Sequence, residues 1–250
     1  MMKIIGIAIV SVALFNVVQA QHVKESQFVL KAGAAIPLGK FAGNNFMPPP
    51  AELHPDGLAQ KGLSITAQYA RSFKGAWGWI AAMGFQTHAR NEEAMQNQVL
   101  NTWVYGAPAS VDANGKRWNI FKFMVGGYYQ NLIQQPSPWT IRPEILLGIT
   151  KTDLPGYSYV AYSNNIASAS GTQINLPLKV ALSYQVNLDL QYALSSTYFV
   201  SMDLSFYHAR PWMEYQYYPN FPQSFNLVTG KKRHYDLSTA ALQCGIGMKF

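Results

Sequence analysis

Residues 182–194 read LSYQVNLDLQYAL, and apolar and polar side chains alternate along nearly all of this stretch. Alternation places every second side chain on the same face of an extended strand. One face then carries leucine, valine and tyrosine, and the other carries serine, glutamine, asparagine and aspartate. Soluble proteins use strands of about 5–6 residues, whereas a tilted strand needs about 9–11 residues to cross a bilayer. This stretch therefore indicates a membrane-spanning strand.

Seven further segments have the length of such a strand, and several of them alternate as clearly. The eight predicted strands are 27–37, 62–73, 78–90, 117–130, 139–151, 181–194, 198–209 and 235–250. The connections between them run 24, 4, 26, 8, 29, 3 and 25 residues, so long and short connections alternate strictly. Membrane β-barrels have short periplasmic turns, long extracellular loops and an even number of strands. The sequence predicts an all-β protein, an eight-stranded antiparallel up-and-down transmembrane β-barrel with four long extracellular loops.

The composition agrees with this prediction. Charged residues form 12% of the chain and aromatic residues 14%, and soluble domains usually contain about 25% charged residues. These values argue against a disordered chain and against a coiled coil. After residue 20, no run approaches the roughly 18 apolar residues of a membrane-spanning helix. A soluble β-sandwich is the alternative fold.

The first 20 residues have the features of a secretory signal peptide. Lys3 precedes an apolar stretch, which is followed by Val18, Gln19 and Ala20. This pattern predicts cleavage before Gln21, which leaves residues 21–250 as one barrel domain. The single cysteine, Cys244, cannot form an intrachain disulfide.

Three motifs occur together in a known group of proteins. Residues 33–41 read GAAIPLGKF, residues 202–207 read MDLSFY, and the last segment alternates and ends on Phe250. With these motifs the mature chain resembles the eight-stranded outer-membrane β-barrels of the OmpA/OmpX type, and among them the PorT-type outer-membrane β-barrel proteins of Bacteroidota. The resemblance implies the outer membrane of a Gram-negative bacterium as location, and Phe250 as part of the signal for the barrel-assembly machinery. Some members support protein secretion and many have no assigned task.

Charged side chains also occur in the inward-facing phase of the predicted strands. An eight-stranded barrel is just wide enough for its side chains to fill it, and an unpaired charge there would be costly. We therefore predict a salt-bridge network that plugs the lumen, and an ion or proton path is the functional alternative. The predicted members are Lys31, Lys122, Arg142, Glu144, Asp189, Asp203 and Lys249.

Basic residues gather in or beside the long loops, and without Lys3 the chain has 18 basic and 12 acidic residues. Lysine and arginine bind phosphate well, so we expect outer-membrane lipid and lipopolysaccharide as partners. A solvated loop face is the alternative. Nucleic acid is not an expected partner of an exported protein. The predicted basic rim consists of Arg90, Lys116, Arg117, Arg210, Lys231, Lys232 and Arg233.

No catalytic site is expected. His88, His208 and His234 lie near predicted strand ends, but their spacing to serine and aspartate matches no hydrolase motif. The chain has no P-loop, dinucleotide fingerprint or Cys/His metal spacing, so no metal or cofactor is expected. We expect a non-enzymatic structural or interaction protein of the cell envelope, accessory to a secretion or uptake complex through an envelope protein partner. A narrow porin-like channel and a surface lipid hydrolase are the alternatives.

Overall fold

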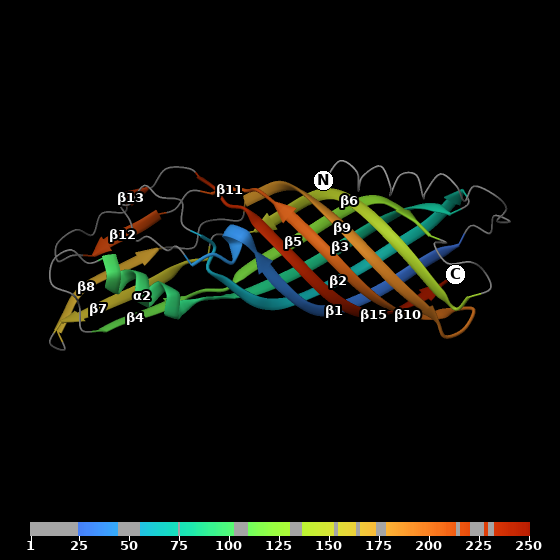
Figure 1. Ribbon diagram of the computed structural model, residues 1–250. Helices are drawn as coiled ribbons and strands as arrows, with labels where there is room; N and C mark the ends of the chain where they lie inside the picture. The colour runs from blue at the N-terminus through green and yellow to red at the C-terminus, as the bar shows by residue number, and fades with distance from the viewer. Residues whose placement is uncertain are drawn as a thin grey trace, which may run out of the picture.

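The computed structural model describes residues 25–44, 56–74, 76–102, 110–130, 137–152, 155–163, 166–173, 179–213, 216–220, 228–229 and 233–250. The predicted signal peptide, its cleavage site before Gln21, Lys231 and Lys232 lie outside the described residues. Figure 1 shows a barrel with an extension at one end, opposite the end that holds the C-terminus.

Eight strands close the barrel. They are β1 (Ser26–Leu38), β2 (Ala59–Lys74), β3 (Trp77–Arg90), β5 (Trp118–Tyr129), β6 (Trp139–Thr152), β9 (Lys179–Ala193), β10 (Tyr198–Ala209) and β15 (Leu237–Lys249). Their order around the barrel is β1-β15-β10-β9-β6-β5-β3-β2, and every neighbouring pair is antiparallel. The fold prediction is confirmed, and each strand end lies within three residues of its predicted position.

The burial of the side chains is inverted relative to a soluble protein. On β9, Leu182 is 84% exposed, whereas Asp189 on the inward face of the same strand is fully buried. Leucine, isoleucine and phenylalanine cover the outer wall of the other strands in the same way. Such an apolar band around a closed barrel matches the hydrocarbon of a bilayer. The soluble sandwich is therefore excluded.

The two ends of the barrel differ. The ends of β1 and β15 lie together, because the backbones of Ser26 and Phe250 exchange hydrogen bonds of 3.0 and 2.9 Å. Short turns connect strands at this end, so we call it the inner end. Aromatic pairs lie here on the outer wall, with 4.9 Å between the ring centroids of Trp77 and Tyr129 and 4.7 Å between those of Trp139 and Tyr192.

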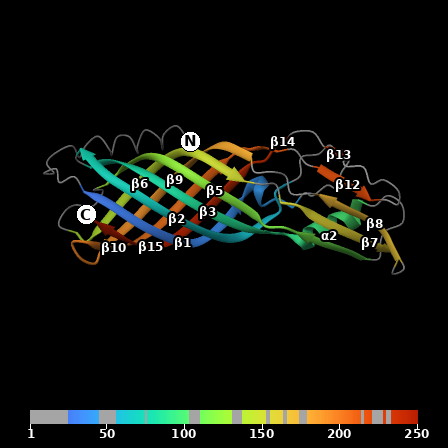
Figure 2. The ribbon, with the colours of Figure 1, turned by 180° about the vertical axis from the view of Figure 1, so that it is seen from behind.

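The connections at the outer end build a second sheet. Its strands are β4 (Ser110–Gly115), β7 (Tyr157–Ser163), β8 (Ile166–Gln173), β12 (Gln216–Asn220) and β13 (Val228–Thr229), in the order β13-β12-β8-β7-β4. We call it the outer sheet. The short strands β11 (Trp212–Met213) and β14 (Arg233–His234) pair with each other between the barrel and this sheet. Figures 1 and 2 show the outer sheet beyond the outer end of the barrel from both sides.

A helix packs beside the outer sheet. Helix α2 (Glu92–Thr102) contacts β4 and buries Met95 completely. Its start is well specified, because the Asn91 side chain accepts a hydrogen bond of 3.1 Å from the backbone N–H of Ala94. This region was predicted to be loop, although an asparagine followed by two glutamates is a helix-start signal. None of the described helices is long and apolar enough to cross a membrane.

Candidate functional site

Four strands bring charged side chains together in the middle of the lumen. Lys31 Nζ lies 3.0 Å from Asp189 Oδ1 and 3.4 Å from Asp203 Oδ1. Arg142 Nε lies 2.8 Å from Glu144 Oε1, and Arg142 Nη2 lies 3.0 Å from Asp189 Oδ2. All five side chains are buried. Asp189 joins the two cations, so the five residues form one network across the barrel.

The other two predicted members lie outside this network. Lys122 Nζ donates a hydrogen bond of 3.0 Å to Gln185 Oε1 and lies 4.5 Å from the centroid of the Tyr207 ring. Lys249 is the last residue of β15, so its side chain reaches the inner rim and pairs there with Glu25 at 3.0 Å, where both side chains are partly exposed. Both lysines were predicted as members of the salt-bridge network, and the structure places both outside its ion pairs, because position along the strand decides which charges meet.

Amide side chains donate hydrogen bonds to two of the three carboxylates, Glu144 and Asp189. Gln68 and Asn187 donate to Glu144 Oε2 at 3.2 and 2.7 Å. Gln191 donates to Asp189 Oδ2 at 2.7 Å. A buried ion pair is tolerated when hydrogen bonds satisfy its remaining lone pairs. The alternation of β9 predicted such amides on the inward face, but it did not indicate their role in the network.

Two buried aromatic rings lie in the lumen on the inner side of the network. Tyr128 lies directly opposite Gly78, and Phe199 lies directly opposite Gly247. At either glycine a Cβ atom would collide with the facing ring, so each ring lies across the bare backbone of its partner. Tyr128 and Phe199 are buried, and Arg142 Cζ lies 5.0 Å from the centroid of the Tyr128 ring. We call these two rings the inner seal.

The described part of the first outer connection (residues 39–44 and 56–58) packs into the mouth of the barrel above the network. Its 3-10 turn η1 (Gly39–Phe41) buries Phe41, which makes edge-on contacts with His88 at 5.2 Å and Trp118 at 5.4 Å between ring centroids. Trp118 Nε1 donates a hydrogen bond of 2.8 Å to the Gly57 carbonyl. The ring centroid of Tyr235 lies 6.1 Å from that of Trp118. We call this group the outer seal.

The predicted basic rim is only partly a rim. Arg90 ends β3 on its inward face, so it is buried, and its Nη1 donates a hydrogen bond of 3.0 Å to the Pro155 carbonyl. Including Arg90 in an exposed rim was wrong. Lys116 and Arg117 are exposed, and the exposed Arg210 pairs with Asp236 at 3.0 Å. Of Arg233 the structure describes the backbone in β14.

Further cations lie directly above the apolar band. Lys61 on β2 and Lys151 on β6 are exposed and occupy the next outward-facing positions beyond Leu63 and Ile149. Arg117 and Arg210 lie two outward-facing positions beyond Phe121 and Phe206. The periodicity of the strands could have singled out Lys61 and Lys151. We call the four exposed cations Lys61, Arg117, Lys151 and Arg210 the outer cation belt.

The three histidines have separate surroundings. His88 is buried, and its Nδ1 lies 3.0 Å from the Gln60 carbonyl oxygen. His234 contacts Trp212 in a tilted arrangement, with 3.5 Å between the ring centroids. His208 faces outward near the outer end of β10, and its Nδ1 lies 2.8 Å from Ser238 Oγ. In the described part of the chain, no group of three potential metal ligands occurs.

These observations fix the architecture. It is that of an eight-stranded outer-membrane β-barrel. No protein-family model and no curated protein matches the chain.

Several solved structures are similar in fold at low identity. The outer membrane protein OprG from Pseudomonas aeruginosa is 14% identical, with a TM-score of 0.49, and the match covers 93% of this chain and 99% of that chain. A major outer membrane protein from Thermus thermophilus is 10% identical, with a TM-score of 0.47 and coverage of 92% and 100%. Ail, the attachment invasion locus protein of Yersinia pestis, is 12% identical, with a TM-score of 0.43 and coverage of 92% and 100%. These likenesses carry no argument about function.

Proposed function

We propose that this protein is a non-conducting anchor in the outer membrane of a Gram-negative bacterium, and that it holds the outer sheet at the cell surface as an interaction platform. The closed lumen carries this proposal, because the charge network lies between the inner and outer seals. A diffusion pore needs a continuous water path through the lumen. Because the network and the two seals fill the lumen, the outer end of the barrel is the surface that remains for function. The role is structural or interactive and non-enzymatic, and it suits an accessory of a secretion or uptake complex.

Single-channel recording in planar bilayers tests the sealed lumen. The purified mature barrel should give no steady conductance steps after insertion, and insertion itself is checked by protease protection of the barrel. Reproducible steps would support the narrow channel instead and would contradict the proposal. A partner of the outer sheet is sought by cross-linking in intact cells.

The motifs of residues 33–41 and 202–207 support membership of the PorT-type barrels. We propose signal-peptide cleavage before Gln21 and recognition of Phe250 by the barrel-assembly machinery. Phe250 is exposed at the inner end and lies beside β1, where the barrel closes. Replacing Phe250 with serine should lower the amount of folded barrel in cells several-fold without changing the stability of refolded protein. Equal amounts in cells would contradict this role.

We propose lipopolysaccharide as the lipid partner of the outer cation belt and the rest of the basic rim. Cations near the headgroup level attract anionic lipid, and arginine pairs well with phosphate. The variant in which Lys61, Lys151 and Arg117 are all changed to glutamine should retain several-fold less lipopolysaccharide than the parent. The matched control is Arg71→Gln, because Arg71 is exposed at the inner end of β2. Equal retention by both variants would remove the proposal.

A surface lipid hydrolase is the second candidate, and one observation favours it. His208 Nδ1 lies 2.8 Å from Ser238 Oγ at the outer end of the lipid-facing wall. In a hydrolase the histidine would act as the base and the serine as the nucleophile. A hydrolase of this kind also needs a group that orients the imidazole and donors for the oxyanion. An acyl-release assay on the parent and on Ser238→Ala decides, and we expect no release from either. Release that Ser238→Ala abolishes would establish the enzyme.

A further inference from the structure

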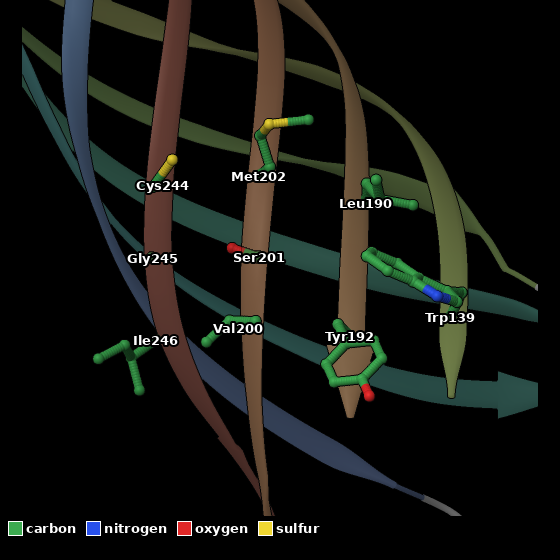
Figure 3. Close-up of a pocket in the computed structure, with 9 residues that line it drawn as sticks. All are labelled: Trp139, Leu190, Tyr192, Val200, Ser201, Met202, Cys244, Gly245 and Ile246. Carbon is green, nitrogen blue, oxygen red and sulfur yellow. The ribbon is translucent and has the colours of Figure 1, made fainter. Parts of the chain in front are cut away.

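A groove of about 670 Å³ opens on the outer wall where β6, β9, β10 and β15 run side by side. Figure 3 shows Trp139 and Tyr192 on one side of it, Cys244 and Ile246 on the other, and Val200 between them. Sites for small molecules usually have volumes of about 300–1,000 Å³. The groove therefore has the size of a small-ligand site rather than of a protein interface.

The groove exists because a short outward-facing side chain lies between larger ones. The strand register places Val200 directly opposite Tyr192 on β9 and Ile246 on β15. The rings of Trp139 and Tyr192 contact each other and form a continuous wall. Val200 is too short to fill the space beside this wall. The hollow is thus specified by sequence at neighbouring positions of three strands.

The position of the groove restricts what can occupy it. Trp139 is the first residue of β6 and Tyr192 is the last but one of β9. Both rings therefore lie at the membrane–water interface at the inner end of the barrel. Tyrosine and tryptophan at this level place their polar atoms towards the headgroups. The Tyr192 hydroxyl points towards the inner ends of the strands (Figure 3). Apart from Ser201, the lining from there to Met202 and Cys244 is apolar or aromatic.

We propose that this groove binds one acyl chain of a phospholipid of the inner leaflet, with the ester region of the lipid beside Trp139 and Tyr192. Lipid is the medium that this wall faces, and an amphipathic lipid matches a groove that is apolar along its length and polar at its inner end. A second copy of the chain fits less well. Specific protein interfaces bury about 800 Å² on each partner, and the surface exposed in the groove is much smaller. The proposal goes beyond the platform role and does not depend on it.

Native mass spectrometry tests the site on mature protein that is purified from membranes in a mild detergent. The parent should retain one phospholipid per barrel. The variants Val200→Trp and Cys244→Phe fill the groove with a bulkier apolar side chain, and each should lower the retained phospholipid at least tenfold. The matched control is Val186→Trp, since Val186 is an outward-facing valine of β9 that does not line the groove. A heat-dependent shift in gel mobility verifies that every variant is folded.

Three results would overturn the proposal. The first is a parent that retains no phospholipid, and the second is equal retention by Val200→Trp and Val186→Trp. The third is a dimer of the parent that Val200→Trp dissociates, because this would assign the groove to a second copy. The presence or absence of conductance in a bilayer recording tests the platform role alone. The two proposals therefore fail independently.

Discussion

The barrel and the outer sheet use the same antiparallel pairing, but their sequences specify it differently. Each barrel strand has 12–16 residues, and its two faces meet lipid and lumen, so nearly every position is constrained to be apolar or polar. The strands of the outer sheet have 2–8 residues, and β12 pairs with β8 across two different connections. A strand between lipid and lumen thus shows an alternation that the sequence alone predicts. The short strands of the outer sheet form through contacts with distant segments, which the sequence alone does not show.

The largest expected effect concerns the lumen of the barrel. Arg142→Ala removes the cation that contacts both Glu144 and Asp189, so Glu144 loses its ion pair and Lys31 remains as the partner of Asp189 and Asp203. We expect a loss of about 3–5 kcal/mol in the free energy of unfolding, because an uncompensated buried charge is costly. Denaturant unfolding of the barrel in lipid vesicles measures the loss. The control Arg71→Ala, at an exposed inner position, should cost less than about 0.5 kcal/mol. A cost below about 1 kcal/mol for Arg142→Ala would contradict the network.

A charge on the lipid-facing wall compares the two regions directly. Val186 lies midway along β9 and faces outward, so Val186→Lys should cost about 2–4 kcal/mol in lipid vesicles. Ser158 is exposed on β7 of the outer sheet, and Ser158→Lys should change the free energy of unfolding by less than about 0.5 kcal/mol. Equal costs at the two positions would break the contrast between lipid and water.

The inner seal gives the next smaller effect. A Cβ at Gly247 would meet the ring of Phe199, so Gly247→Ala should cost about 1–3 kcal/mol by overpacking. Gly127 on β5 has room for a Cβ, whose nearest neighbour would be the Gly78 carbonyl oxygen at 3.6 Å. Gly127→Ala is therefore the matched control, with an expected cost under about 0.5 kcal/mol. Thermal unfolding of both variants in the same detergent is the measurement, and identical midpoints would argue against a packed seal.

The smallest effect on the barrel should come from removing part of the outer sheet. Replacement of residues 157–173, which form β7 and β8, by a short turn removes the centre of that sheet. The barrel strands keep all their partners, so the unfolding free energy of the barrel should change by less than about 1 kcal/mol. Capture of a surface partner by cross-linking should be lost with the sheet. A barrel that no longer folds would show that the two regions are one cooperative unit.

The same contrast explains what the sequence could predict about the site. The inward phase of Lys31, Asp189 and Asp203 follows from alternation, so their place in the lumen was predictable. The different surroundings of Lys122 and Lys249 depend on depth along the barrel, which a period of two does not encode. The inner seal depends on cross-strand pairs such as Phe199 with Gly247, and these require the register of two strands. Helix α2 had a local signal at Asn91, but its neighbour β4 pairs with a strand from a different connection.

The most direct test of the account is the gel mobility of the protein from fractionated cells, with and without boiling in detergent. The account predicts that the protein is found in the outer-membrane fraction and that boiling shifts it from a faster, folded band to a slower, unfolded band. A single band that boiling does not shift, recovered from the soluble periplasmic fraction, would contradict a lipid-embedded barrel.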